Sequence, residues 1–88
     1  METRVALIAI IVEDGDSVQA VNQLLHEYGG YIIGRMGIPY REKGISIISI
    51  AIDAPQEVVS ALSGKIGRLP HVSTKTAYSN VVTKAKTE

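Results

Sequence analysis

Two arginines on one short segment are the clearest binding chemistry in this sequence. Side chains alternate along a strand, so four residues of the segment share one side: Arg35, Gly37, Pro39 and Arg41. Guanidinium groups bind carboxylates and phosphates through several hydrogen bonds, and glycine allows a backbone to approach a ligand closely. The segment therefore predicts a site for a small anionic effector. The alternative is that the arginines only protect a sheet edge against aggregation.

A second glycine lies in the acidic turn formed by residues 13–16. We expect this turn to approach the arginine strand at a subunit interface, where Gly15 gives the backbone room beside a ligand. The predicted ligand-binding set is Gly15, Arg35, Gly37 and Arg41.

The residues that could hold a metal or catalyse a reaction do not form a recognisable set. His26 and His71 are far apart in the sequence, no cysteine accompanies them, and helix capping explains the acidic turn. Neither a nucleophile elbow nor a glycine-rich phosphate loop is present. We therefore predict no catalytic residue, no metal site, no cofactor and no enzymatic activity.

The length and charge of the chain restrict its class. Its 88 residues are enough for one small domain, and without cysteine that domain gains no disulfide support, so we expect a homodimer or homotetramer. Nine basic and nine acidic residues balance, which argues against direct nucleic-acid binding; a DNA contact would fall to Lys65, Arg68, Lys75, Lys84 and Lys86. The apolar run at residues 5–12 is too short to span a membrane, and a cytoplasmic protein is expected.

The hydrophobic pattern predicts the order βαββαβ. Strands are expected over 5–12, 31–40, 45–52 and 71–78, with helices between the first two and the last two. This order is typical of the ferredoxin-like α+β sandwich, a four-stranded antiparallel sheet with two helices on one face. Residues 1–78 would form the domain and 79–88 a polar tail, although two valines could extend the last strand.

Local signals predict how the two helices begin and end. Asp16 or Ser17 is expected to cap the first helix and Asp53 the second. Gly29 and Gly30 would end the first helix, because glycine adopts the left-handed conformation of many helix C-termini.

The sheet face opposite the helices would remain uncovered. Strands 5–12 and 45–52 are apolar on both faces, so that bare face favours an oligomer. The alternative is that four small residues make the face tolerable to water: Ala6, Ala9, Ser46 and Ser49.

Three motifs resemble the small family of proposed iron-only hydrogenase system regulators. They are Arg35-x-Gly37-x-Pro39-x-Arg41-Glu42, then Ala61-Leu62-Ser63-Gly64-Lys65-x-Gly67, then Val72-x-x-Lys75-Thr76. The resemblance covers the chain from Arg4 to about Tyr78. It implies a fold related to ACT domains and to the C-terminal domain of nickel-responsive repressors, with a regulatory role near hydrogenase maturation. It carries over no catalytic residue.

Two departures from the nickel-responsive repressors bear on function. Their histidine and cysteine ligands are not matched here, and the first strand begins at about Arg4, where those repressors carry a DNA-binding domain. The leading hypothesis is an ACT-like oligomeric regulator that senses a small effector. The alternatives are an assembly module without a small ligand, and a transcriptional regulator that lacks its own DNA-binding domain.

Overall fold

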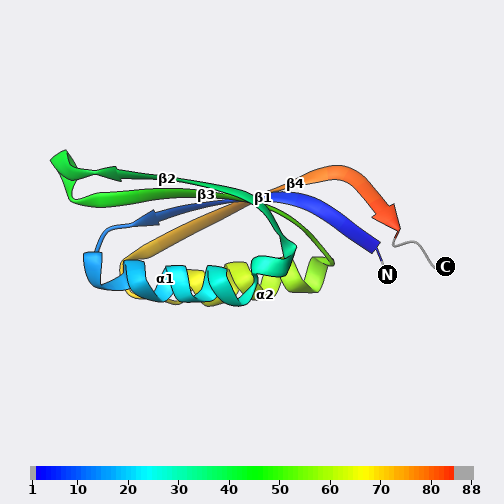
Figure 1. Cartoon of the computed structure of the whole chain (residues 1–88), viewed down its shortest axis with the longest axis horizontal. Helices are drawn as coiled ribbons and strands as arrows, with labels where there is room; N and C mark the ends of the chain where they lie inside the picture. Colours follow the sequence, from blue (N-terminus) through cyan, green and yellow to red (C-terminus); the bar gives the residue numbers. More distant parts are fainter. Residues whose placement is uncertain (1, 85–88) are drawn as a thin grey trace.

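The chain folds into two layers, a sheet and a pair of helices (Figure 1). The computed structural model describes residues 2–84, with side chains described as far as residue 81. The elements in chain order are β1 (Glu2–Val12), α1 (Gly15–Glu27), β2 (Ile32–Tyr40), β3 (Ile45–Ala54), α2 (Gln56–Gly67) and β4 (Val72–Lys84). Short 3-10 turns lie at Gly29–Tyr31 and Arg41–Lys43.

The four strands form one antiparallel sheet in the order β2-β3-β1-β4. Both helices lie on the same face of it (Figure 1). The two strands predicted to be apolar on both faces, β1 and β3, are the central ones, and this confirms the ferredoxin-like α+β prediction. β4 continues to Lys84, so the strand includes most of the segment predicted as a tail; residues 85–88 lie outside the described part of the chain.

The core lies between the sheet and the helices. Alternate residues of β1 and β3 point toward the helices and are buried, and each helix contributes one apolar stripe. The buried apolar residues are Ala6, Ile8, Ile10, Val12, Val21, Leu25, Ile48, Ile50, Ile52, Ala54, Val59, Leu62 and Ile66. None of the helices in the described part of the chain is long and apolar enough to cross a membrane.

The predicted caps of both helices are wrong. Asp14, rather than Asp16 or Ser17, caps α1 by accepting a hydrogen bond from the backbone N–H of Asp16 at 3.0 Å. The Ser17 hydroxyl instead donates to the carbonyl of Pro70 at 2.7 Å and ties α1 to the segment before β4. α2 begins after Pro55 without a side-chain cap, and Asp53 belongs to β3.

α1 ends where the two glycines predict, but their expected conformation is wrong. The helix ends at Glu27 with Tyr28 as its C-cap, and Gly29 and Gly30 form a 3-10 turn without positive φ. The left-handed glycine of the described chain is Gly44, whose φ of 65° closes the turn between β2 and β3. An L-residue with a side chain would be strained there.

The β2–β3 hairpin overhangs the helical layer. Its tip extends past the first turn of α1, and the described chain measures 49 × 19 × 16 Å along its principal axes (Figure 1). β2 is an edge strand paired only with β3, and none of its nine residues is buried. The hairpin therefore presents two accessible sides, one toward α1 and one away from it.

Candidate functional site

A groove lies between α1 and the β2–β3 hairpin. We call it the hairpin groove; its volume is about 230 Å³. It exists because the hairpin overhangs α1 without packing closely onto it. Nine residues line it: Val18 and Asn22 of α1, Arg35, Gly37, Ile38 and Pro39 of β2, and Ser46, Ile47 and Ile48 of β3.

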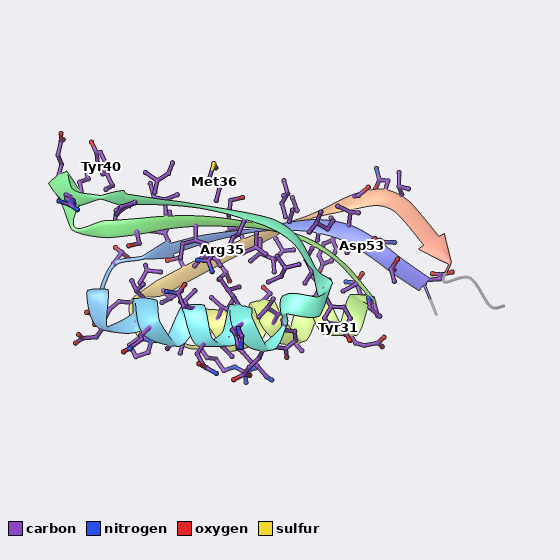
Figure 2. The ribbon with its side chains drawn as sticks, in the orientation of Figure 1. Tyr31, Arg35, Met36, Tyr40 and Asp53 are labelled. Atoms are coloured by element: carbon purple, nitrogen blue, oxygen red, sulfur yellow. The ribbon has the colours of Figure 1, made fainter. Side chains whose placement is uncertain are left out.

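Arg35 is the charged residue of the hairpin groove. Its side chain lies between β2 and α1 (Figure 2), and Nη2 donates a hydrogen bond to Oδ1 of Asn22 at 3.0 Å. Within the described residues it has no ion-pair partner. A guanidinium carries five N–H donors, so most remain available to a ligand. Asn22 accepts through its oxygen, and its NH2 group is then a further donor without a partner in the described chain.

Gly37 leaves the hairpin groove open. A Cβ built at this position would have no atom within 4 Å, and the residue faces the helices because it pairs with Ile48, which is buried in the core. Pro39 follows on the same side and has no N–H to donate. The groove thus combines a cationic end at Arg35 with a wall that is largely apolar.

The predicted ligand-binding residues are only partly brought together. Arg35 and Gly37 line the hairpin groove, as the alternation predicts, whereas Gly15 and Arg41 do not. Gly15 is the first residue of α1, and Arg41 begins the 3-10 turn at the hairpin tip. Sequence reasoning missed Asn22, although it lies four residues after Val18 and therefore on a neighbouring position of one helical face.

The two histidines lie toward opposite ends of α1. The carbonyl of His71 accepts a hydrogen bond from the N–H of Glu13, just before the helix, whereas His26 is in its last turn. A helix of 13 residues separates these positions by roughly 15–20 Å. Within the described residues, no group of three or more metal-ligating side chains comes together.

The two glycines of the α2 motif have different surroundings within the described chain. A Cβ built at Gly64 would lie 3.3 Å from the guanidinium of Arg68, whose Nε donates to the Gly64 carbonyl at 3.1 Å. Gly67 is the glycine near a strand, since a Cβ there would lie 3.3 Å from the hydroxyl of Thr74. Lys65 is solvated, with its ammonium 5.2 Å from the centre of the Tyr28 ring.

The second candidate surface is the sheet face that no described helix covers, which we call the open face. The strand register places sixteen residues on it: Val5, Leu7, Ala9, Ile11, Gly34, Met36, Ile38, Tyr40, Ile45, Ile47, Ser49, Ala51, Asp53, Ser73, Lys75 and Ala77. Met36 and Leu7 are 60% and 51% exposed. Figure 2 shows Met36 and Tyr40 pointing away from the helices, opposite to Arg35.

The open face is mostly apolar and nearly free of charge. Of its residues only Asp53 and Lys75 are charged, with opposite signs. Ser49 and Ala9 lie on it as expected, but Ala6 is buried against the helices and Ser46 lines the hairpin groove. The small residues therefore only partly make this face tolerable to water. Beside Leu7, a shallow apolar hollow of about 270 Å³ lies between β1 and β4.

Comparison with known proteins places this arrangement in a family. A family model described as "TM1266-like: Iron-only hydrogenase system regulator, putative" matches residues 4–76. The chain belongs to this family. The resemblance seen in the three sequence motifs is thereby confirmed, and the match includes Arg35, Arg41 and the whole of α1 and α2.

Solved structures support both the family and the fold. The uncharacterized protein TM1266 from Thermotoga maritima is 32% identical, with a TM-score of 0.83 over 86% of this chain and 96% of that chain. A formyltetrahydrofolate deformylase from Pseudomonas putida KT2440 has a TM-score of 0.64 at 12% identity, over 88% of this chain and 29% of that chain. The second likeness shows the fold alone. Comparison with curated proteins gives no match.

Proposed function

We propose that this member of the TM1266-like family is a regulatory module, rather than an enzyme, that binds a small anionic effector in the hairpin groove. The observation that carries the proposal is the Arg35 guanidinium. It faces a groove, is held by one neutral partner, and is paired with no carboxylate among the described residues. A cation left in this way is suited to an external carboxylate or phosphate.

The walls of the groove indicate the shape of the effector. Beyond Arg35 and Asn22 they are mainly apolar, with Val18, Ile47 and Ile48 among the lining residues. A volume of about 230 Å³ lies below the roughly 300–1,000 Å³ of drug-sized sites. The expected ligand is therefore a small molecule with one anionic group and a short apolar part. In a family described as a hydrogenase system regulator, such an effector would report a metabolic state to a partner.

The test is anion binding by two-dimensional NMR, with inorganic phosphate and small carboxylates as probes. We expect shifts of the Asn22 side-chain amide and of the Gly37 backbone amide. Arg35→Ala should weaken phosphate binding about tenfold or more, since a charge-assisted hydrogen bond contributes about 1.5–3 kcal/mol. Arg68→Ala is the matched control, because it removes the same charge from the residue after α2, outside the lining of the groove.

Arg41→Ala reports whether the hairpin tip takes part, as the sequence predicts. A loss of affinity in this variant would extend the site beyond the groove toward the tip. Equal affinity in the wild type, Arg35→Ala and Arg68→Ala would refute the assignment of the groove.

A second candidate function is an assembly module without a small ligand. The apolar open face favours it, because surfaces of this kind commonly mark protein interfaces. Under this alternative, self-association would be unchanged by phosphate or carboxylates, and Arg35 and Arg41 would serve only as edge protection.

A further inference from the structure

β2 supplies residues both to the hairpin groove and to the open face. Arg35 and Gly37 point toward α1 and line the groove. Met36, Ile38 and Tyr40 alternate with them on the other side and are 60%, 48% and 39% exposed, and Ile38 also borders the groove. The two surfaces are therefore the two sides of a single strand, one residue apart.

The attachment of β2 to the rest of the domain is weak. The strand pairs with β3 alone, contains no buried residue, and is interrupted by a register shift between Ile32 and Gly34. Within the described part of the chain, its side-chain hydrogen bond to α1 is the one from Arg35 to Asn22. An edge strand with few buried contacts opens locally at a low free energy, so its order can be changed by whatever binds either side.

We propose that an anion in the hairpin groove strengthens self-association of this chain through the open face, with β2 as the coupling element. This inference rests on the proposed function and adds that effector binding changes the oligomeric state of the chain. Each event orders the same hairpin. If anion binding occurs first, self-association no longer has to order the hairpin, and the reverse also holds. Anion binding and self-association are therefore positively cooperative.

The occupant of the open face that fits best is a second copy of the chain. Four strands about 4.8 Å apart, with about eight residues each at 3.3 Å, give a footprint of about 500 Å² per copy. Two copies then bury about 1,000 Å², near the lower limit for a specific interface. Asp53 and Lys75 carry opposite charges, so the face is neutral overall and two copies do not repel each other.

Linkage fixes the size and the symmetry of the effect. A typical coupling of about tenfold per site means that the associated form binds the anion about tenfold more tightly than the free form. By reciprocity, a saturating anion lowers the dissociation constant of a dimer with two sites by up to a hundredfold. Amide exchange of Ile38 and Tyr40 should slow in both cases, because the same strand becomes ordered.

The test compares dimer dissociation constants by sedimentation velocity, and one arm needs no ligand. Gly37→Val places a side chain in open space of the groove and occupies part of it permanently. We expect self-association to become about tenfold tighter in this variant without any anion. Met36→Glu puts a charge on the open face, at a position outside the groove lining, and should remain monomeric under every condition, also when combined with Gly37→Val.

The second arm adds inorganic phosphate at constant ionic strength, with chloride as the reference. Phosphate should strengthen association of the wild type and have no effect on Arg35→Ala. If phosphate fails to bind but Gly37→Val tightens association, the coupling stands and phosphate is not accepted by the groove. If phosphate binds at Arg35 and neither arm changes association, the coupling is overturned while the binding function stands. A wild type that is monomeric in both arms overturns the inference.

Discussion

Two isoleucines of β3 provide a direct test of which face of the sheet is buried against the helices and which is open. Ile50 lies opposite Ile8 on the helix side and is fully buried, whereas Ile47 lies opposite Ile11 on the open face and is 37% exposed. Both are on the same central strand, so the loss of β-propensity on substitution by alanine is similar. The difference between Ile50→Ala and Ile47→Ala therefore isolates the burial of the two faces.

The expected magnitudes follow from that burial. Replacing isoleucine by alanine removes about three carbon atoms, with a transfer free energy of about 2.4 kcal/mol when the side chain is fully buried. For Ile50 a cavity in the core adds to this, giving a loss of about 3–4 kcal/mol. For Ile47 the exposed fraction reduces the transfer contribution to about 1.5 kcal/mol, and water or neighbouring side chains fill the space. The total free energy of unfolding of a domain of this size is about 5–10 kcal/mol. The Ile50→Ala variant should therefore be only marginally stable.

Urea denaturation followed by far-ultraviolet circular dichroism measures both losses. At low protein concentration we expect Ile50→Ala to lose at least twice as much free energy of unfolding as Ile47→Ala. At higher concentration the cost of Ile47→Ala should rise while that of Ile50→Ala stays constant, because only Ile47 would be buried by a second copy. Equal losses at low concentration would contradict the assignment of the buried and open faces.

Three further predictions concern local contacts. Ser17→Ala should lower the free energy of unfolding by about 1 kcal/mol in urea denaturation, because its hydrogen bond to the segment before β4 is lost. The control Ser60→Ala, at an exposed position, should change it by no more than about 0.5 kcal/mol. Similar losses in the two variants would contradict the anchoring role of Ser17. Gly44→Ala should lower stability by about 1 kcal/mol because φ is 65° there, and an unchanged urea midpoint would argue against that turn. Tyr28 raises the pKa of Lys65 above its ordinary value of 10.5, first by hydrogen bonding and then by charge. The resulting stabilisation is present below pH 10.5 and is lost as the pH rises through the raised pKa, so Tyr28→Phe should lower that pKa in an NMR titration.

The fold could be predicted because buried positions are occupied by apolar residues at the spacing of strands and helices. The strands at residues 5–12 and 45–52 are apolar at successive positions, which is typical of central strands, and the structure places both in the middle of the sheet. The helical stripes ending at Leu25 and Ile66 are likewise readable, since one face of each helix must be buried.

The caps could not be predicted because several neighbouring residues compete for them. Asp14, Asp16 and Ser17 can all accept a hydrogen bond from a free backbone N–H. In the structure Asp14 is the cap, and the Ser17 hydroxyl instead donates to the carbonyl of Pro70, 53 residues away. A local pattern contains no information on such a long-range partner.

The candidate site was predictable along the strand but not across the groove. Alternation places Arg35 and Gly37 on one side of β2. The contact with Asn22 additionally requires the distance between β2 and α1, which is set by how far the hairpin overhangs the helical layer. Gly15 was assigned from its place in a turn and Arg41 from the same alternation, which assumed that the strand continues to residue 41. β2 ends at Tyr40, and the fold places Gly15 at the helix start and Arg41 at the hairpin tip, outside the lining of the groove.

The chemistry of β2 is more than edge protection requires. Pro39 by itself removes a backbone donor, and charged residues on an edge would complete the protection against pairing with another chain. The strand instead separates its chemistry by side, with Arg35 toward α1 and the apolar row of Met36, Ile38 and Tyr40 on the other face. That row raises the risk of non-specific association, a cost without benefit unless the face has a defined partner. A cation on one side and an apolar surface on the other fit a strand that joins ligand binding to assembly.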